Sequence, residues 1–187
     1  MELFGLAIPA GIAGFLLLSV VVMYNSLVRI RNHCDEAWAD VETELKRRYN
    51  LIPNLVNTVK GYAAHERELL EQVVRLREEC ARNGGTPGQQ VDSEQRFQTA
   101  LHGLLLRVEN YPDLKASSNF LALQEELANT ENRIQAALRF YNGNVRDNNN
   151  RVQTFPSAII AGMFGFKVRE YFKLEEPAMA APPAVTL

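Results

Sequence analysis

Residues 3–24 read LFGLAIPAGIAGFLLLSVVVMY, an apolar run without one charged side chain. A helix of about 20 apolar residues crosses the hydrocarbon core of a bilayer, and Pro9 lies near the start of the run, where a helix best tolerates proline. A buried core helix is a weaker interpretation, because a run without a polar face would need protein on every side. We therefore predict an N-terminal transmembrane anchor over residues 1–24.

The flanks of this run argue against a cleaved signal peptide and indicate an orientation. A signal peptide has basic residues before its apolar stretch and a small-residue cleavage site after it, but here only Met1 and Glu2 precede the stretch and SVVVMYN closes it. Arg29 and Arg31 follow the run, whereas no Lys or Arg precedes it. Because basic residues gather on the cytoplasmic side, we expect a short N-terminus outside and the larger C-terminal part in the cytoplasm.

The charge and cysteine content exclude some partners. The chain has 20 basic and 22 acidic residues, so no strong field draws in nucleic acid. The densest basic run, Lys46-Arg47-Arg48, precedes a helix-stop signal at residues 50–53 and is interpreted as cations at the negative end of a helix dipole. Cys34 and Cys80 form no C-x-x-C motif, so we interpret them as apolar fillers in a reducing compartment and predict no metal site.

Apolar residues at alternating spacings of three and four predict long amphipathic helices after the anchor. The expected helices cover residues 25–49 (continuous with the anchor), 50–82, 92–111 and 117–155, and a loop over residues 83–88 follows the second. The second has the clearest seam: Ile52, Leu55, Val59, Tyr62, Glu66, Leu69, Val73, Leu76 and Cys80. Helices joined by short connections bury their stripes against each other. We therefore predict an all-α fold, a transmembrane helix followed by an antiparallel bundle of about four long helices.

The part after the anchor divides by composition into three segments. Residues 25–155 form the bundle domain, residues 156–174 an apolar C-terminal segment, and residues 175–187 a Pro/Ala-rich tail that we expect to be disordered. The stretch FPSAIIAGMFGF over residues 155–166 has no charge and is too short to span a bilayer. It either folds back on the bundle or contacts a neighbouring subunit or partner, because exposed apolar patches mark interaction sites.

Several motifs follow the anchor in a fixed order. They are Tyr24-Asn25, Ala37-Trp38, Leu51-Ile52-Pro53-Asn54-Leu55-Val56, Val59-Lys60-Gly61-Tyr62-Ala63, Tyr111-Pro112-Asp113-Leu114-Lys115, Thr130-Glu131-Asn132-Arg133-Ile134 and Phe164-Gly165-Phe166. Over residues 24–172 this order closely resembles the LemA family of bacterial membrane proteins. The resemblance implies a single-pass inner-membrane protein with a helical-bundle domain and no well-defined biochemical activity. Some members are associated with magnetosome membranes, so it also permits a membrane-organising role. The match also includes Tyr141-Asn142, and where the family repeats this Tyr-Asn pair one heptad later, this chain has Asn148-Asn149.

Polar residues on the apolar stripes are the candidates for chemistry. His65-Glu66 begins like the zinc motif His-Glu-x-x-His, but Leu69 stands where the second histidine belongs. We instead predict that Glu66 forms a structural polar pair with Arg133 across the bundle, which would fix helix register. We predict no catalytic residue, cofactor or metal ligand.

The expected function is that of a membrane-anchored scaffold or adaptor, not an enzyme, which acts through self-association or another membrane protein. The expected interaction residues are Phe155, Ile159, Ile160, Phe164, Phe166 and Trp38. Besides these partners and the lipid bilayer, no nucleic acid or small-molecule substrate is predicted. Two alternatives stay open. One is a lipid-binding or membrane-shaping module that lays the first helix or residues 164–166 on the membrane. The other is an enzyme or metal-dependent protein that uses His65 and Glu66.

Overall fold

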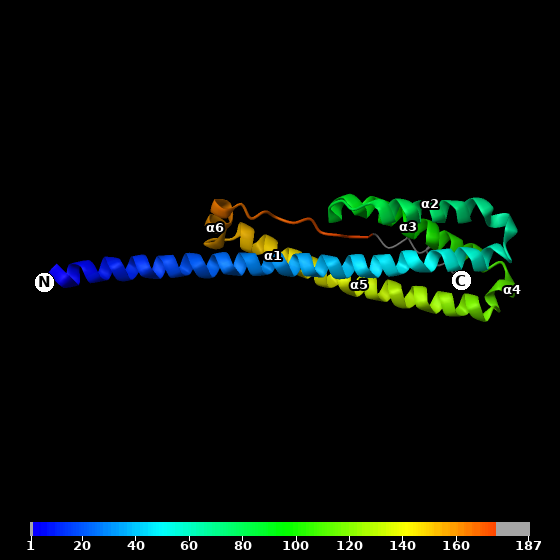
Figure 1. Cartoon of the computed structure of the whole chain (residues 1–187), viewed down its shortest axis with the longest axis horizontal. Helices are drawn as coiled ribbons and strands as arrows, with labels where there is room; N and C mark the ends of the chain where they lie inside the picture. Colours follow the sequence, from blue (N-terminus) through cyan, green and yellow to red (C-terminus); the bar gives the residue numbers. More distant parts are fainter. Residues whose placement is uncertain (1, 175–187) are drawn as a thin grey trace, which may run out of the picture. The chain divides into compact units, whose positions relative to one another are not determined.

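The computed structural model describes residues 2–174, with side chains from Gly11 onward apart from that of Ala64. Over these residues the regular elements are all helical (Figure 1), which confirms the predicted all-α fold. They are α1 (Glu2–Lys60), η1 (Ala64–Glu66), α2 (Arg67–Arg82), α3 (Pro87–Val108), α4 (Pro112–Lys115), α5 (Ser118–Gln153) and α6 (Ser157–Phe164). The tail predicted over residues 175–187 lies outside the described residues.

The helices group into two compact units. Unit 1 comprises the residues up to Ala39 together with Arg139–Glu170. Unit 2 comprises Asp40–Leu138 and a segment that begins at Tyr171. Helices α1 and α5 contribute to both units, whereas α2, α3 and α4 belong to unit 2 and α6 belongs to unit 1.

Unit 2 is an antiparallel helical bundle. Within the described residues, its long helices are the C-terminal part of α1, then α2, α3 and the N-terminal part of α5, which run alternately in opposite directions (Figure 1). Each helix turns an apolar stripe inward, and burial of one large apolar side chain contributes about 1.5–3 kcal/mol. The buried side chains include Val41, Leu45, Ile52, Leu55, Val59, Leu70, Val73, Leu76, Phe97, Leu104, Phe120, Leu127 and Ile134.

Helix α1 does not end at Tyr49, so the predicted boundary between the first and second helices is wrong. It continues through Pro53 to Lys60. Proline has no N–H, so the carbonyl of Tyr49, four residues earlier, loses its usual partner in the helix. Arg77 of α2 replaces that partner, because its Nε donates to the Tyr49 carbonyl at 3.1 Å. A contact from another helix thus removes part of the cost of proline inside α1.

The break falls instead after Lys60. The N–H groups of Tyr62 and Ala63 both donate to the carbonyl of Val59, at 3.0 and 2.9 Å, and the chain turns through η1 into α2. The predicted seam is therefore split between two helices. Its ends are buried as expected, but Tyr62 is exposed and Leu70 is buried in place of Leu69.

Helix α3 begins earlier than residue 92, the start that the apolar spacing predicted. Its first residue is Pro87, a position that suits proline because the N–H would be unpaired there anyway. The preceding Thr86 forms a capping box with Gln89, in which the Thr86 N–H donates to Gln89 Oε1 at 2.9 Å. The loop is accordingly shorter than the predicted residues 83–88.

In unit 1, α6 packs on α1. Ile160 and Ala161 of α6 are buried with Leu27 of α1. Gly165 ends α6 at φ +72°, where a side chain would be strained, and the N–H of Phe166 reaches back to the Ala161 carbonyl at 2.9 Å. The apolar C-terminal segment thus forms a helix that folds back onto α1.

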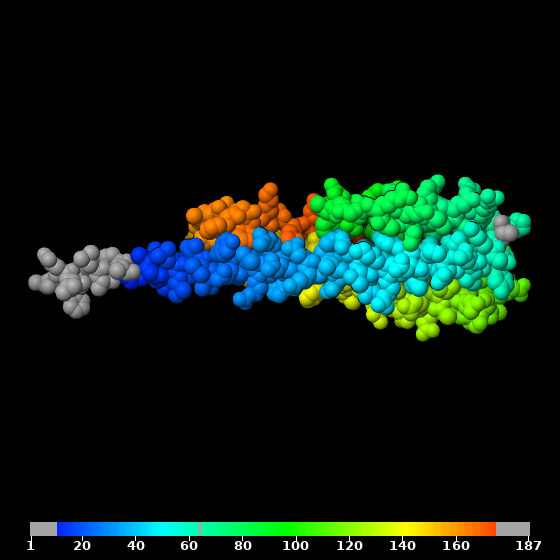
Figure 2. Space-filling model, viewed as in Figure 1, coloured from blue at the N-terminus to red at the C-terminus, as the bar shows by residue number. Residues whose placement is uncertain are grey.

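The N-terminal part of α1 is uncovered. From Gly11 onward, α1 is long and apolar enough to cross a membrane: its most apolar 18-residue window has a mean hydropathy of 2.0, and 6% of that window is buried. Figure 2 shows these residues, in blue, extending past α6 with no other helix over them on the visible face. The exposed side chains include Ile12, Phe15, Leu16, Leu17, Leu18, Val21 and Val22.

Candidate functional site

A cluster of charged side chains lies buried in the core of unit 2. Arg48 of α1 is 1% exposed, and its Nη2 donates to Glu94 Oε2 of α3. Its Nη1 donates to Glu131 Oε2 of α5 at 3.1 Å. The guanidinium also lies 5.1 Å from the centre of the Phe97 ring. One cation therefore joins three helices of the bundle.

The Glu94 carboxylate is bonded at both oxygens. Tyr49 of α1 donates its hydroxyl to Glu94 Oε1, while Arg48 occupies the other oxygen. Burial raises the pKa of the Tyr49 phenol, and the charge of Glu94 raises it further, so the hydroxyl keeps its proton and remains a donor. Because removing charges from water is costly, a buried carboxylate needs this full set of partners. The arrangement fixes the register of α1 against α3 and α5.

The interpretation of residues 46–48 as cations at a helix end is wrong for Arg48. Helix α1 continues for more than two turns beyond this residue, and Arg48 faces the core. The sequence did contain a signal: Arg48 lies between Leu45 and Ile52 on the buried stripe of α1. Likewise Glu94 lies one turn before Phe97 on the stripe of α3. A cation and a carboxylate on two apolar stripes are the pattern of a buried ion pair.

Glu66 and Arg133 do not form the predicted polar pair in this structure. Glu66 Oε1 accepts a hydrogen bond from the hydroxyl of Tyr111 at 3.2 Å. Arg133 is exposed on α5, and over the described residues no ion pair joins it to Glu66. The buried cation and carboxylate expected from this pair are supplied by Arg48, Glu94 and Glu131.

His65 lies beside Glu66 in an open hollow at the start of α2. The hollow is lined by His65, Glu66, Glu68, Leu69, Gln72 and Arg107. No group of three or more His, Cys, Asp or Glu side chains that could hold a metal ion occurs in the described part of the chain. One cation, Arg107, lines this hollow together with the carboxylates of Glu66 and Glu68, an arrangement typical of a solvated polar surface.

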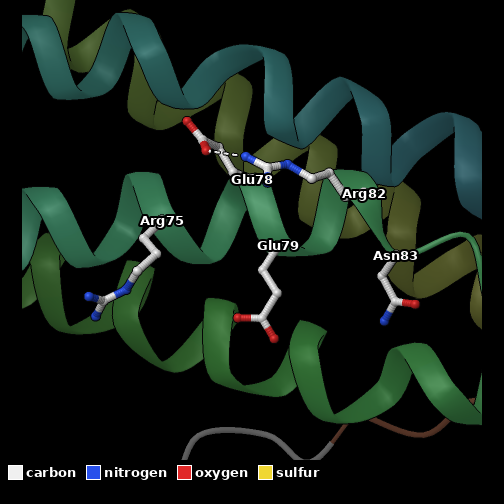
Figure 3. A pocket seen from close by; sticks show the side chains of 5 residues that line it. All are labelled: Arg75, Glu78, Glu79, Arg82 and Asn83. Atoms are coloured by element: carbon white, nitrogen blue, oxygen red, sulfur yellow. Dashed lines mark hydrogen bonds and ion pairs between the residues drawn. The ribbon is translucent and has the colours of Figure 1, made fainter.

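A second open hollow follows the exposed side of α2 and is drawn in Figure 3. Arg75, Glu78, Glu79, Arg82 and Asn83 line it. Two of the cations near it are paired: Arg82 donates to Glu78 at 2.7 Å, and Glu79 accepts from Arg96 of α3. Exposed pairs of this kind contribute about 0–1 kcal/mol each. Arg75 makes no ion pair among the described residues, as Figure 3 shows, so the hollow presents one exposed guanidinium beside neutralised charges.

Asparagines of α5 hold the segment that follows α6 in unit 1. Asn149 Nδ2 donates to the Arg169 carbonyl at 3.0 Å, and the Arg169 N–H donates back to Asn149 Oδ1 at 2.8 Å. Asn148 is buried, and its Nδ2 donates to the Lys167 carbonyl at 3.2 Å. The Asn148-Asn149 pair thus binds the backbone of residues 167–169 through its side-chain amides.

The predicted interaction residues fall into two groups. Ile160 is buried and Phe166 half-buried against α1, and Trp38 packs on the Tyr141 ring with their centres 5.2 Å apart. The others remain on the surface of unit 1: Phe155, Ile159 and Phe164.

Comparison with known proteins gives consistent matches. A family model described as the LemA family matches residues 37–187. Protein LemA of Metamycoplasma hominis is 25% identical over 166 residues, 82% of this chain and 76% of that protein. Magnetosome protein MamQ of Magnetospirillum gryphiswaldense is 24% identical over 189 residues, 88% of this chain and 69% of that protein. Magnetosome protein MamQ 2 of Paramagnetospirillum magneticum is 25% identical with the same coverage.

Proposed function

The chain belongs to the LemA family, and from that premise we propose that it is a single-pass membrane scaffold or adaptor that acts by association. The motif resemblance is confirmed, and the family, the named relatives and the apolar α1 together indicate a membrane-associated helical protein. In the proposal, residues up to Tyr24 span a bacterial inner membrane. Arg29 and Arg31, just beyond, favour a cytoplasmic location for unit 2.

The observation that carries the proposal is the continuity of α1. One helix of 59 residues supplies both the uncovered apolar stretch and a core helix of unit 2. Leu55 and Val59, near its C-terminal end, are fully buried, whereas Leu16 and Leu17 are largely exposed. A membrane anchor confines the attached domain to two dimensions and so raises the effective concentration of any membrane-bound partner. Weak contacts made by the domain then suffice for assembly.

One end of unit 2 carries exposed apolar side chains for such contacts. Helices α1 and α3 end there and α5 begins there (Figure 1). Tyr62, just beyond α1, is 49% exposed, and Leu106 of α3 and Leu121 of α5 are each 52% exposed. We call this set the apolar end of unit 2. Aromatic and aliphatic side chains in the centre of an interface supply most of its binding energy, so the proposal places a protein partner, or a second copy of the chain, at this end.

The proposal assigns no catalytic activity. The buried carboxylate of Glu94 is fully bonded within its cluster, and Glu66 accepts from Tyr111, so both support structure. The relatives named magnetosome proteins support membrane association.

Association is tested by measuring the mass of the complex taken from its own membrane. Particles cut from native membranes by a lipid-solubilising polymer, without detergent, are analysed by native mass spectrometry. We expect more than one copy of the chain, or one copy with a second protein, and we expect the double variant Leu106→Ser/Leu121→Ser to lower that fraction. The exposed Ala81→Ser on α2 is the matched control. A single copy with lipid alone in the wild type would refute the proposal.

A further inference from the structure

Helix α6 lies beside the last turns of the apolar run of α1. The buried pair Ile160 and Ala161 contacts Leu27, and Val20 and Met23 of α1 pack against the same cluster. Both Val20 and Met23 belong to the uncharged stretch that forms the anchor. The position of α6 along α1 is therefore fixed at the point where the anchor meets the polar part of the chain.

Aromatic rings extend this contact. The Tyr24 ring lies edge-on to those of Phe164 and Phe166, with centres 4.9 and 5.7 Å apart. Tyrosine is enriched at the boundary between hydrocarbon and headgroups, because its ring is apolar and its hydroxyl is polar. Tyr24 is 38% exposed, so it can occupy that boundary while it packs on α6.

The outer face of α6 is apolar and uncovered. Ile159 and Met163 are 56% and 72% exposed, and Phe155, two residues before α6, is 82% exposed. No charged residue lies between Arg151 and Lys167. Exposed apolar patches of this kind mark contacts with protein or membrane. The question is which of the two occupies this face.

Basic residues lie on the polar side of this apolar region. Arg29 and Arg31 follow the run on α1, and Lys167 and Arg169 follow α6. The Arg31 guanidinium lies 5.5 Å from the centre of the Phe166 ring, so this cation is next to the aromatic contact between α1 and the end of α6. Arg169 also pairs with Asp35 at 2.7 Å. Lysines and arginines next to a membrane-inserted segment bind the phosphates of lipid headgroups, so the charges complement a bilayer at this level.

We propose that α6 is an interfacial helix, whose outer face lies among the headgroups and upper acyl chains of the leaflet through which α1 leaves the bilayer. This proposal rests on the membrane anchoring by α1 in the proposed function. The bilayer is the occupant because α6 is seated against anchor residues, where lipid surrounds α1. The protein therefore enters one leaflet at two segments that are adjacent in space but far apart in the sequence.

The test measures the depth of labels in the intact protein. Single variants Leu17→Cys, Ile159→Cys and Leu121→Cys are labelled with an environment-sensitive fluorophore and reconstituted in vesicles of phosphatidylcholine and phosphatidylglycerol. The vesicles carry nitroxide lipids that quench either near the headgroups or near the chain ends. The native thiols Cys34 and Cys80 are buried, and burial raises the pKa of both, so an exposed introduced thiol reacts first.

The three labels distinguish this proposal from the proposed anchor. We expect the Ile159 label to lose fluorescence chiefly to the shallow quencher, the Leu17 label chiefly to the deep quencher, and the Leu121 label to neither. Quenching at Leu17 without quenching at Ile159 would overturn the proposal for α6 and leave the anchor intact. Quenching at neither position would overturn both.

A second variant tests the face itself. Met163→Glu places a charge among the exposed apolar side chains of α6 without touching its buried side, so the helix should still pack on α1. We expect this change to reduce the shallow quenching of the Ile159 label while the Leu17 label is unchanged. Unchanged quenching at Ile159 would contradict a lipid contact through this face.

Discussion

Among single residues, Arg48 has the strongest predicted effect on the stability of unit 2. Its removal leaves Glu94 buried without its cation, and breaking a buried ion pair from one side costs about 3–5 kcal/mol. We therefore expect Arg48→Ala to lower the free energy of unfolding by about 3 kcal/mol or more. Urea denaturation of the full chain in detergent micelles, followed by circular dichroism, measures this change.

The control is an exposed cation on the same helix. Lys46 is 71% exposed and its Nζ lies 4.0 Å from Glu42 Oε2, a geometry that contributes about 0–1 kcal/mol. Lys46→Ala should therefore leave the unfolding midpoint nearly unchanged. Equal losses in the two variants would contradict a special role for the buried cluster.

The buried phenol of Tyr141 should lower the stability of the folded protein in alkali. Burial raises the pKa of its phenol from 10.0 to about 12, and its hydroxyl donates to the Glu170 carbonyl at 2.9 Å. The folded state disfavours the ionised phenol. The stability that the neutral Tyr141 hydroxyl contributes is therefore complete below about pH 10 and is lost as the pH rises through about 12. Unfolding midpoints measured across this range should fall, and Tyr141→Phe should make the fall less steep. A slope that Tyr141→Phe does not change would refute the assignment.

At the scale of elements, apolar spacing predicted the helices well and their ends poorly. The fourth predicted helix begins within a residue of α5, because its apolar stripe is a local signal. The boundary at Tyr49 failed because Pro53 is a local stop signal, whereas Arg77, which compensates for it, is distant in sequence. The Arg48 cluster was missed because its partners are also distant in sequence. The spacing of apolar residues along one helix does not show which other helices pack against it.

The Arg169 backbone should depend on one asparagine. Asn149 makes two hydrogen bonds to the backbone of Arg169, and a hydrogen bond contributes about 0.5–1.5 kcal/mol. Asn149→Ala should therefore loosen the chain locally at Arg169, while Asn148 still bonds the Lys167 carbonyl and α5 stays helical. Hydrogen exchange read by mass spectrometry should show faster exchange of the Arg169 amide.

The adjacent asparagine provides the matched control. Asn150 is exposed, and it takes part in the described hydrogen bonds through its backbone carbonyl. Asn150→Ala should leave the exchange of residues 167–170 as in the wild type. Protection of the Arg169 amide in Asn149→Ala would show that other contacts hold the segment.

For the whole molecule, the proposed orientation puts unit 2 in the cytoplasm. If Arg29 and Arg31 lie at the cytoplasmic surface as proposed, protease added to inverted inner-membrane vesicles should digest unit 2. Protease added to intact spheroplasts should leave it whole. The opposite pattern would place unit 2 outside the cytoplasm, although the anchor would still hold.

Photo-cross-linking in native membranes tests most directly whether the protein acts by association, as proposed. A photo-reactive residue is placed at Leu121, in the apolar end of unit 2, and at the exposed Ala81 as control. We expect a reproducible protein adduct at position 121, either a second copy of the chain or another membrane protein, and much less at position 81. The absence of any protein adduct at position 121, or equal adducts at both positions, would contradict it.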